Sequence, residues 1–220
     1  MQLTNAPDPA KFPAIEAAIE GRRLDRYMAA AKGDRKLAWR LYVWNGDLCE
    51  AFYLPLQTVE IVVRNAIHRA LVQRCGAAWW TNPTFRNLLP QRCDSELQRA
   101  VQQEHQQHAG GMTDHHLVSA LTFGFWETLT IKRFERLLWP RGVQPQFPHS
   151  AGASRQTLHD EIEKQRRWRN RIAHHRAIYD QSPTAHFQGA IQLIGWVSPD
   201  TAAWVTSEAR VSQVVSARPS

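Results

Sequence analysis

The feature that most constrains the fold of this chain is one long run of apolar residues at helical spacing. Such a stripe forms one face of an α-helix, so residues 37–71 are predicted to form a long central helix that is buried along one side. Pro55 falls within the run and lacks a backbone N–H, so we expect a kink there or a division into two helices. Gly76 is expected to end it. The stripe consists of Leu37, Leu41, Trp44, Leu48, Phe52, Leu56, Val59, Val63, Ile67 and Leu71.

Further helices are expected on both sides of this spine. The pattern predicts a first helix near 24–31, followed by Gly33 and Asp34 as a C-cap and N-cap pair. Residues 141–154 are rich in proline and glycine and lack periodicity, which predicts a long loop. No segment alternates as a strand would, so the predicted fold class is all-α. The other predicted helices cover 94–108, 117–139, 154–175 and, with an interruption near Ser198 and Pro199, 184–209.

The length, net charge and cysteine content of the chain limit the functions it could have. The 220 residues carry a net charge of +7, with a pI of about 9.8, so the surface is expected to attract polyanions, RNA among them. The three cysteines, Cys49, Cys75 and Cys93, have no CxxC spacing, which argues against a disulfide framework and a zinc knuckle. We expect a soluble cytoplasmic protein with no membrane partner. The expected organisation is an N-terminal extension (1–22), a helical domain (23–210) and a flexible tail (211–220).

The stretch richest in candidate binding and catalytic side chains is KQRRWRNRIAHHR, residues 164–176. A solvated helix end, whose cations complement the helix dipole, would explain the charge alone. Asn170 and His174 are four residues apart and should share a helix face, with Arg169 at its margin. Because a guanidinium can hold a phosphate and an imidazole can move a proton, these types suit phosphodiester cleavage if they converge on one space. The residues expected to bind RNA are Lys164, Arg166, Arg167, Trp168, Arg171 and Arg176.

Three motifs resemble one family. RNRIAH at 169–174 matches the R-N-x-x-x-H form of the RX4-6H motif of HEPN ribonucleases. Abi-like (abortive infection) proteins carry RNRIAHH after a stretch similar to LYVWNGDLCEAFYLPLQTVEIVVRNAIHRAL, and they also carry an FGFW element, found here at 123–126. The chain thus resembles Abi-like HEPN proteins over roughly 23–196. The resemblance implies a HEPN-like helical bundle with additional helices, which typically forms a homodimer.

The resemblance also implies an activity. Arg169, Asn170 and His174 would cleave RNA without a metal or cofactor, the 2′-hydroxyl attacking the adjacent phosphorus. His174 would shuttle the proton and Arg169 would neutralise developing charge. The cellular role implied is a toxin or antiphage effector, restrained by an antitoxin or other regulatory protein. A non-catalytic HEPN module that binds RNA or a protein partner is the alternative. Nucleotide transfer is a third, for which the chain offers no nucleotide-binding loop.

Other polar and aromatic residues allow more than one role. Glu60, Arg64 and His68 recur every four residues along the spine, with Asn65 beside them. They are either a buried ion-pair network that fixes packing or, with His175, support for the site. His105 and His108 have chelating spacing, but their glutamine-rich surroundings favour a solvated helix, so no metal site is expected. Core positions are expected for Trp39, Trp44 and Trp126, while Trp168 is left open as a base-stacking residue.

Overall fold

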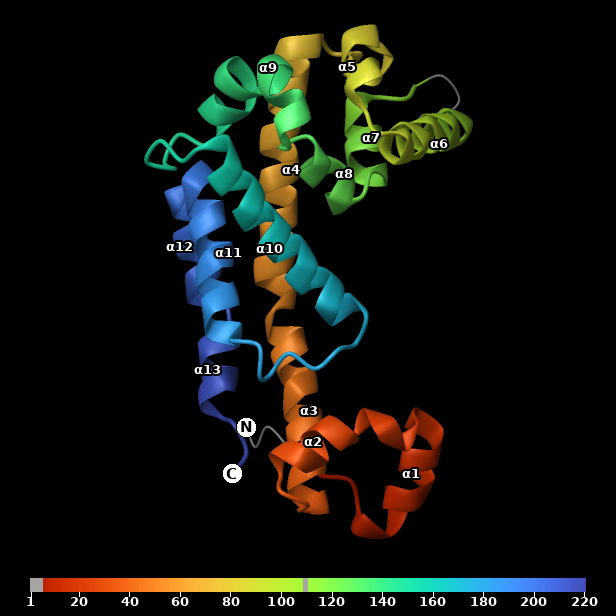
Figure 1. Ribbon diagram of the computed structural model, residues 1–220, viewed down its shortest axis with the longest axis vertical. Helices are drawn as coiled ribbons and strands as arrows, with labels where there is room; N and C mark the ends of the chain where they lie inside the picture. The colour runs from red at the N-terminus through yellow and green to blue at the C-terminus, as the bar shows by residue number, and fades with distance from the viewer. Residues whose placement is uncertain (1–5, 109–110) are drawn as a thin grey trace.

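The computed structural model describes residues 6–108 and 111–220, and it confirms an all-α protein: 77% is helical and the described part contains no strand. The predicted spine is present as α3 (Arg35–Ala51) and α4 (Tyr53–Cys75), which lie end to end through the length of the molecule (Figure 1). The break falls at Phe52, three residues before Pro55. Since Pro55 has no N–H to donate to the carbonyl of Ala51, the helical ladder is interrupted where the sequence predicts it.

The caps at both ends of the spine also match the sequence. Gly33 has a φ of +90°, and the side chain of Asp34 accepts a hydrogen bond from the N–H of Leu37 at 3.0 Å. Gly76 ends α4 with a φ of +86°, a conformation that costs glycine little. Before the spine lie α1 (Phe12–Ile19) and α2 (Asp25–Ala30), the latter being the helix expected near 24–31.

The middle of the chain forms more and shorter helices than its sequence pattern predicts. The single helix expected at 117–139 is split, because Thr122 caps a new short helix within it. Of the predicted loop 141–154, the first part continues as turns of π-helix (Trp139–Val143) and 3-10 helix (Gln144–Gln146). The helices here are α5 (Pro83–Leu88), α6 (Gln91–His108), α7 (Asp114–Ala120), α8 (Phe123–Thr128) and α9 (Glu135–Leu138).

The part of the chain from residue 155 onward returns along the spine. It forms α10 (Arg155–Ala173), α11 (Pro183–Val197), α12 (Pro199–Glu208) and α13 (Val211–Ser216). The interruption expected near Ser198 is confirmed, since Ser198 both ends α11 and caps α12. The predicted flexible tail differs from the structure: Val211 and Val214 of α13 are buried, and the indole N–H of Trp44 donates to the carbonyl of Val214 at 2.7 Å. Burial of these two side chains provides the driving force to order the segment.

Two hydrophobic clusters hold these helices together. One cluster, which we name the upper core, surrounds most of α4 and includes Trp126, which is fully buried. The other cluster, which we name the lower core, surrounds α3 and includes Trp39 and Trp44. Trp39, Trp44 and Trp126 are therefore all buried, as the sequence predicts. Residues from both predicted end segments contribute to the lower core: Phe12 from the described part of 1–22, and Val211 and Val214 from 211–220. Hydrophobic contacts therefore cross both predicted domain boundaries. Within the described ranges, no helix is long and apolar enough to cross a membrane.

Candidate nucleic-acid interface and catalytic site

Helix α10 carries the basic stretch, and its last turn places the candidate catalytic residues. Ser154 caps its start by accepting from the N–H of Thr157 at 3.0 Å. At its end the N–H of His175 bonds the carbonyl of Ile172, and that of Arg176 bonds the carbonyl of Arg171. This pair of bonds is the Schellman motif, which requires a left-handed residue. His175 occupies that position with a φ of +54°. Its backbone geometry gives His175 a structural role at this turn.

The chain that follows is fastened to the spine by one buried side chain. The Oδ1 of Asn45, in α3, accepts hydrogen bonds from the N–H of Ile178 at 2.8 Å and of Tyr179 at 3.3 Å. Arg171 adds a hydrogen bond from its Nε to the carbonyl of Ala177 at 2.8 Å. The segment that follows His174 is therefore held by hydrogen bonds to α3 and to α10.

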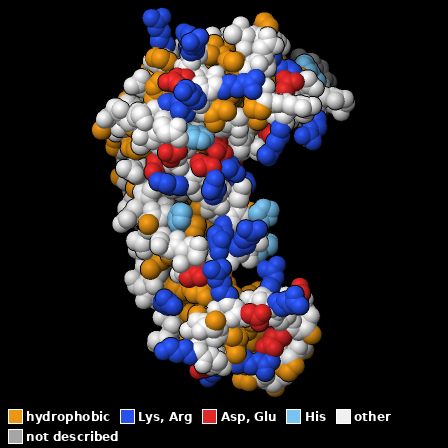
Figure 2. Space-filling view, viewed as in Figure 1, with side chains coloured by type: hydrophobic (Ala, Val, Ile, Leu, Met, Phe, Trp, Pro, Cys, Tyr) orange, Lys and Arg blue, Asp and Glu red, His pale blue; other side chains and the backbone are white. Residues whose placement is uncertain are grey.

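A basic groove of about 580 Å³ runs along the exposed side of this region. Figure 2 shows lysine, arginine and histidine side chains gathered on the right-hand edge of the molecule, over the C-terminal end of α10. Two of its cations are paired at the surface, Lys164 with Glu161 at 2.6 Å and Arg167 with Glu163 at 2.7 Å. Such exposed pairs are weak and leave the cations able to bind a polyanion. We name this surface the basic groove; its lining is Lys164, Arg167, Trp168, Asn170, Arg171, His174, Arg176, Gln181 and His186.

Of the three predicted catalytic residues, the basic groove contains Asn170 and His174 but not Arg169. Five residues along an α-helix turn the side-chain direction by about 500°, so Arg169 points about 140° away from His174. The expectation that Arg169 borders their face is therefore wrong, as is their convergence on one space within a single chain. One link remains, an Nη1 of Arg169 at 3.4 Å from the Oδ1 of Asn170.

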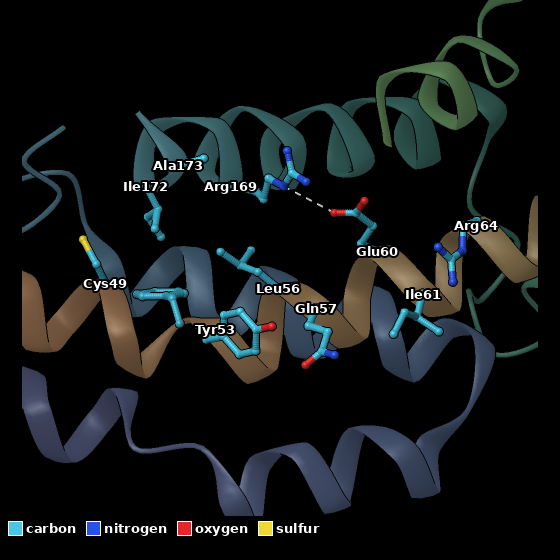
Figure 3. Close-up of a pocket in the computed structure, with 11 residues that line it drawn as sticks. Cys49, Tyr53, Leu56, Gln57, Glu60, Ile61, Arg64, Arg169, Ile172 and Ala173 are labelled. Carbon is cyan, nitrogen blue, oxygen red and sulfur yellow. Dashed lines mark ion pairs between the residues drawn. The ribbon is translucent and has the colours of Figure 1, made fainter. Parts of the chain in front are cut away.

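Arg169 instead lines a second, largely apolar groove between α10 and the spine (Figure 3). Its Nε lies 3.4 Å from the carboxylate of Glu60, the pair drawn with a dashed line in the figure. Tyr53 is 71% exposed in the same groove. We name this surface the apolar groove; its lining is Cys49, Phe52, Tyr53, Leu56, Gln57, Glu60, Ile61, Arg64, Arg169, Ile172 and Ala173.

The predicted polar seam of α4 does not act as one unit. Glu60 and Arg64 line the apolar groove, and Glu60 forms an ion pair with Arg169 there. His68 belongs elsewhere: its Nε2 lies 3.2 Å from the carboxylate of Asp114 in α7, and its ring packs beside Trp79 and Trp126. Burial lowers the pKa of His68, and this outweighs the attraction of Asp114. Asn65 lines neither groove. Site support is thus restricted to Glu60 and Arg64 within this seam.

Two residues predicted to bind RNA are engaged in packing. Arg166 faces α8, where it forms an ion pair with Glu127, which is 8% exposed. The FGFW element, which immediately precedes Glu127, thus packs against α10. Trp168 is 2% exposed and meets Phe52 edge to face, which excludes base stacking in this conformation. Arg166 points away from the basic groove because each residue along a helix turns the side-chain direction by about 100°. Trp168 lies in the groove lining, but its ring is covered by Phe52 and His186.

His186 is a groove residue that sequence reasoning missed. Its ring stacks on Trp168, with centroids 3.9 Å apart and planes 10° from parallel, and lies in the lining of the basic groove. Burial, assisted by the charge of Lys164, lowers the pKa of His186. No local motif marks this residue, because α11 meets α10 only in the tertiary structure.

Comparison with known proteins adds no family assignment. No family model, curated protein or solved structure matches this chain. The fold is shown as all-α, while its relation to HEPN proteins rests on the three motifs alone.

Proposed function

We propose that this chain is a metal-independent endoribonuclease of HEPN type that binds RNA in the basic groove. The observation that carries the proposal is the position of His174: an exposed imidazole, with Asn170 beside it, inside a groove lined by lysine and arginine. Phosphate contacts from these cations would hold the strand, and the imidazole is the proton-transfer group that cleavage needs.

In the proposed reaction the 2′-oxygen forms a bond to the adjacent phosphorus and the bond to the 5′-oxygen breaks. His174 takes the proton from the 2′-hydroxyl and delivers it to the leaving 5′-oxygen, leaving a 2′,3′-cyclic phosphate and a 5′-hydroxyl. Asn170 orients the phosphate or the imidazole. A guanidinium stabilises charge on the phosphoryl oxygens. Arg171 and Arg176 lie in the same groove and can supply this group, while Arg169, paired with Glu60 on the other face, would act only where a second copy of the chain brings it close.

We include a homodimer in the proposal, formed across the apolar groove. The exposure of Tyr53 and the apolar side chains around it support this, since burial in a second copy removes this surface from water. Such a dimer would bring the two copies of Arg169 to one interface. The role as a cytoplasmic toxin or antiphage effector, restrained by an antitoxin or other regulatory protein, rests on the family resemblance.

The test is incubation of labelled single-stranded RNA with the purified chain in EDTA. Wild type is expected to produce cyclic-phosphate ends, and His174→Ala to reduce the rate by at least about 100-fold, as expected for loss of a general acid-base group. The control is His105→Ala, an exposed histidine on α6 outside the groove, which should cut like wild type. Equal cutting by His174→Ala would remove this residue from the mechanism.

A non-catalytic RNA-binding module is the second candidate. The pairing of Arg169 with Glu60, on a different face from His174, favours it. This candidate predicts RNA binding with a steep salt dependence and no new RNA ends, so the same gel separates the two functions.

A further inference from the structure

A group of three side chains at the junction of α6 and α7 has no part in the proposed cleavage. Glu104 and His108 lie one turn apart on α6, and His116 comes from α7. One donor atom from each lies within 4.8 Å of the other two. Both helices lie in the upper part of the molecule, whereas the end of α10 with the basic groove lies near its middle (Figure 1).

We propose that Glu104, His108 and His116 form a binding site for a divalent transition-metal ion, Zn²⁺ foremost. Zinc bonds to imidazole nitrogen and carboxylate oxygen are about 2.0–2.2 Å long, which puts tetrahedral neighbours roughly 3.3 Å apart. The Nε2 of His108 lies 3.2 Å from the Oε2 of Glu104, so this pair already has the required spacing. Three protein ligands leave a fourth position for water.

The surroundings of Glu104 support a cation. Its carboxylate belongs to a residue only 9% exposed, and its ion-pair partner within the described residues is His108. Burying a carboxylate is costly unless it is paired, and a single contact leaves part of its hydrogen-bonding capacity unused. A metal ion that accepts electron pairs from the carboxylate and both imidazoles offsets that cost more completely. Two nitrogen donors favour zinc over magnesium, which prefers oxygen ligands.

Metal binding requires one local rearrangement. The rings of His108 and His116 are stacked, with centroids 3.7 Å apart and planes 7° from parallel. Ring nitrogens bind metals in the plane of the ring, so two parallel rings cannot both point at one ion. His116 is half-buried and must turn about its side-chain bonds, giving up the hydrogen bond that its Nδ1 accepts from the N–H of Thr113 at 3.1 Å.

A metal here would brace the upper part of the fold. Glu104 and His108 would fix α6 to α7 through His116, two residues after Asp114. Asp114 in turn contacts His68 of the spine at 3.2 Å. The ion would therefore join α6 to α7, which already contacts the spine through Asp114, and none of its ligands lines the basic groove.

The experiment is zinc titration of the untagged full-length chain by calorimetry, after treatment with a chelator and its removal. Wild type is expected to bind one Zn²⁺ per chain and no Mg²⁺ at the same concentration. His108→Gln and His116→Gln should each weaken zinc binding at least about 10-fold, since even outer partners of metal ligands have effects of this size. Glutamine at position 116 can still accept the capping hydrogen bond of α7, so a lost cap would not explain the change.

The neighbouring histidines provide matched controls. His105 is exposed on α6 and the side chain of His115 is 84% exposed on α7, both outside the cluster. His105→Gln and His115→Gln should bind zinc like wild type. Absence of zinc binding by wild type, or equal loss in the control variants, would overturn the proposal. Thermal unfolding gives a second measure: zinc should raise the melting temperature of wild type and leave that of His116→Gln unchanged.

Discussion

Replacing Asn45 with alanine should loosen the turn that carries His174. The Oδ1 of Asn45 accepts from two backbone N–H groups, those of Ile178 and Tyr179. Ile178 is fully buried and Tyr179 is 7% exposed, so neither N–H can turn to bulk water. An unsatisfied buried donor costs about 1–3 kcal/mol, and the weaker geometry of the second bond, at 3.3 Å, places it at the low end of that range.

The expected loss for Asn45→Ala is therefore about 2–4 kcal/mol in the free energy of unfolding. For a chain of this size, each kcal/mol shifts the melting temperature by roughly 2–4 °C. Thermal unfolding followed by circular dichroism should show a decrease of roughly 4–16 °C. Cleavage should fall as well, since the released turn no longer holds His174 beside Asn170.

Asn65→Ala is the matched control for this prediction. Asn65 is half-buried on the spine, so its substitution should cost less than about 1 kcal/mol. A melting temperature for Asn45→Ala within about 2 °C of wild type would refute the reasoning, because it would mean that the two N–H groups find other acceptors.

Three further changes test other parts of the structure. His175→Gly should raise the free energy of unfolding by about 0.5–1 kcal/mol in chemical denaturation and keep cleavage, because glycine adopts the positive φ at lower cost; lost cleavage would instead give His175 a role in the site. Tyr53→Arg should convert the dimer to a monomer in light scattering, and a persisting dimer would move the interface away from the apolar groove. His68 titrates with a lowered pKa in the fold, so wild-type stability should fall as the pH drops below the ordinary value of 6.5; His68→Gln should flatten that decline, and an unchanged slope would contradict it.

The parts of the fold that could be predicted from sequence are those with local causes. The stripe from Leu37 to Leu71 places the spine, Pro55 its interruption, and Gly33, Asp34 and Gly76 its caps. The short helices between α5 and α9 are harder, since a threonine cap such as Thr122 divides a pattern that still has helical spacing. Val211 and Val214 are too few to predict a packed helix, because their burial depends on the surface of α3.

The candidate site could be predicted in part. The groove does contain Asn170, His174 and the cations Lys164, Arg167, Arg171 and Arg176. Arg169 and Arg166 point away from that face because each step along a helix turns by about 100°, and Trp168, although it lies in the groove lining, is covered by Phe52 and His186. Their actual partners, Glu60, Glu127 and His186, come from three other helices. Such partners depend on helix packing and leave no local trace in the chain.

The missing backbone hydrogen bond at Pro55 has a mechanical consequence. The spine is weakest between its two halves, close to the boundary between the upper and lower cores. Helix α10 crosses that boundary, contributing Leu158 and Ile162 to the upper core and Trp168 to the lower one. Helix α10 therefore packs against both halves of the spine and bridges the interruption at Phe52. A polyanion bound to the cations of α10 in the basic groove would make this helix more rigid. Bending of the spine at Phe52 and binding in the basic groove would therefore be coupled.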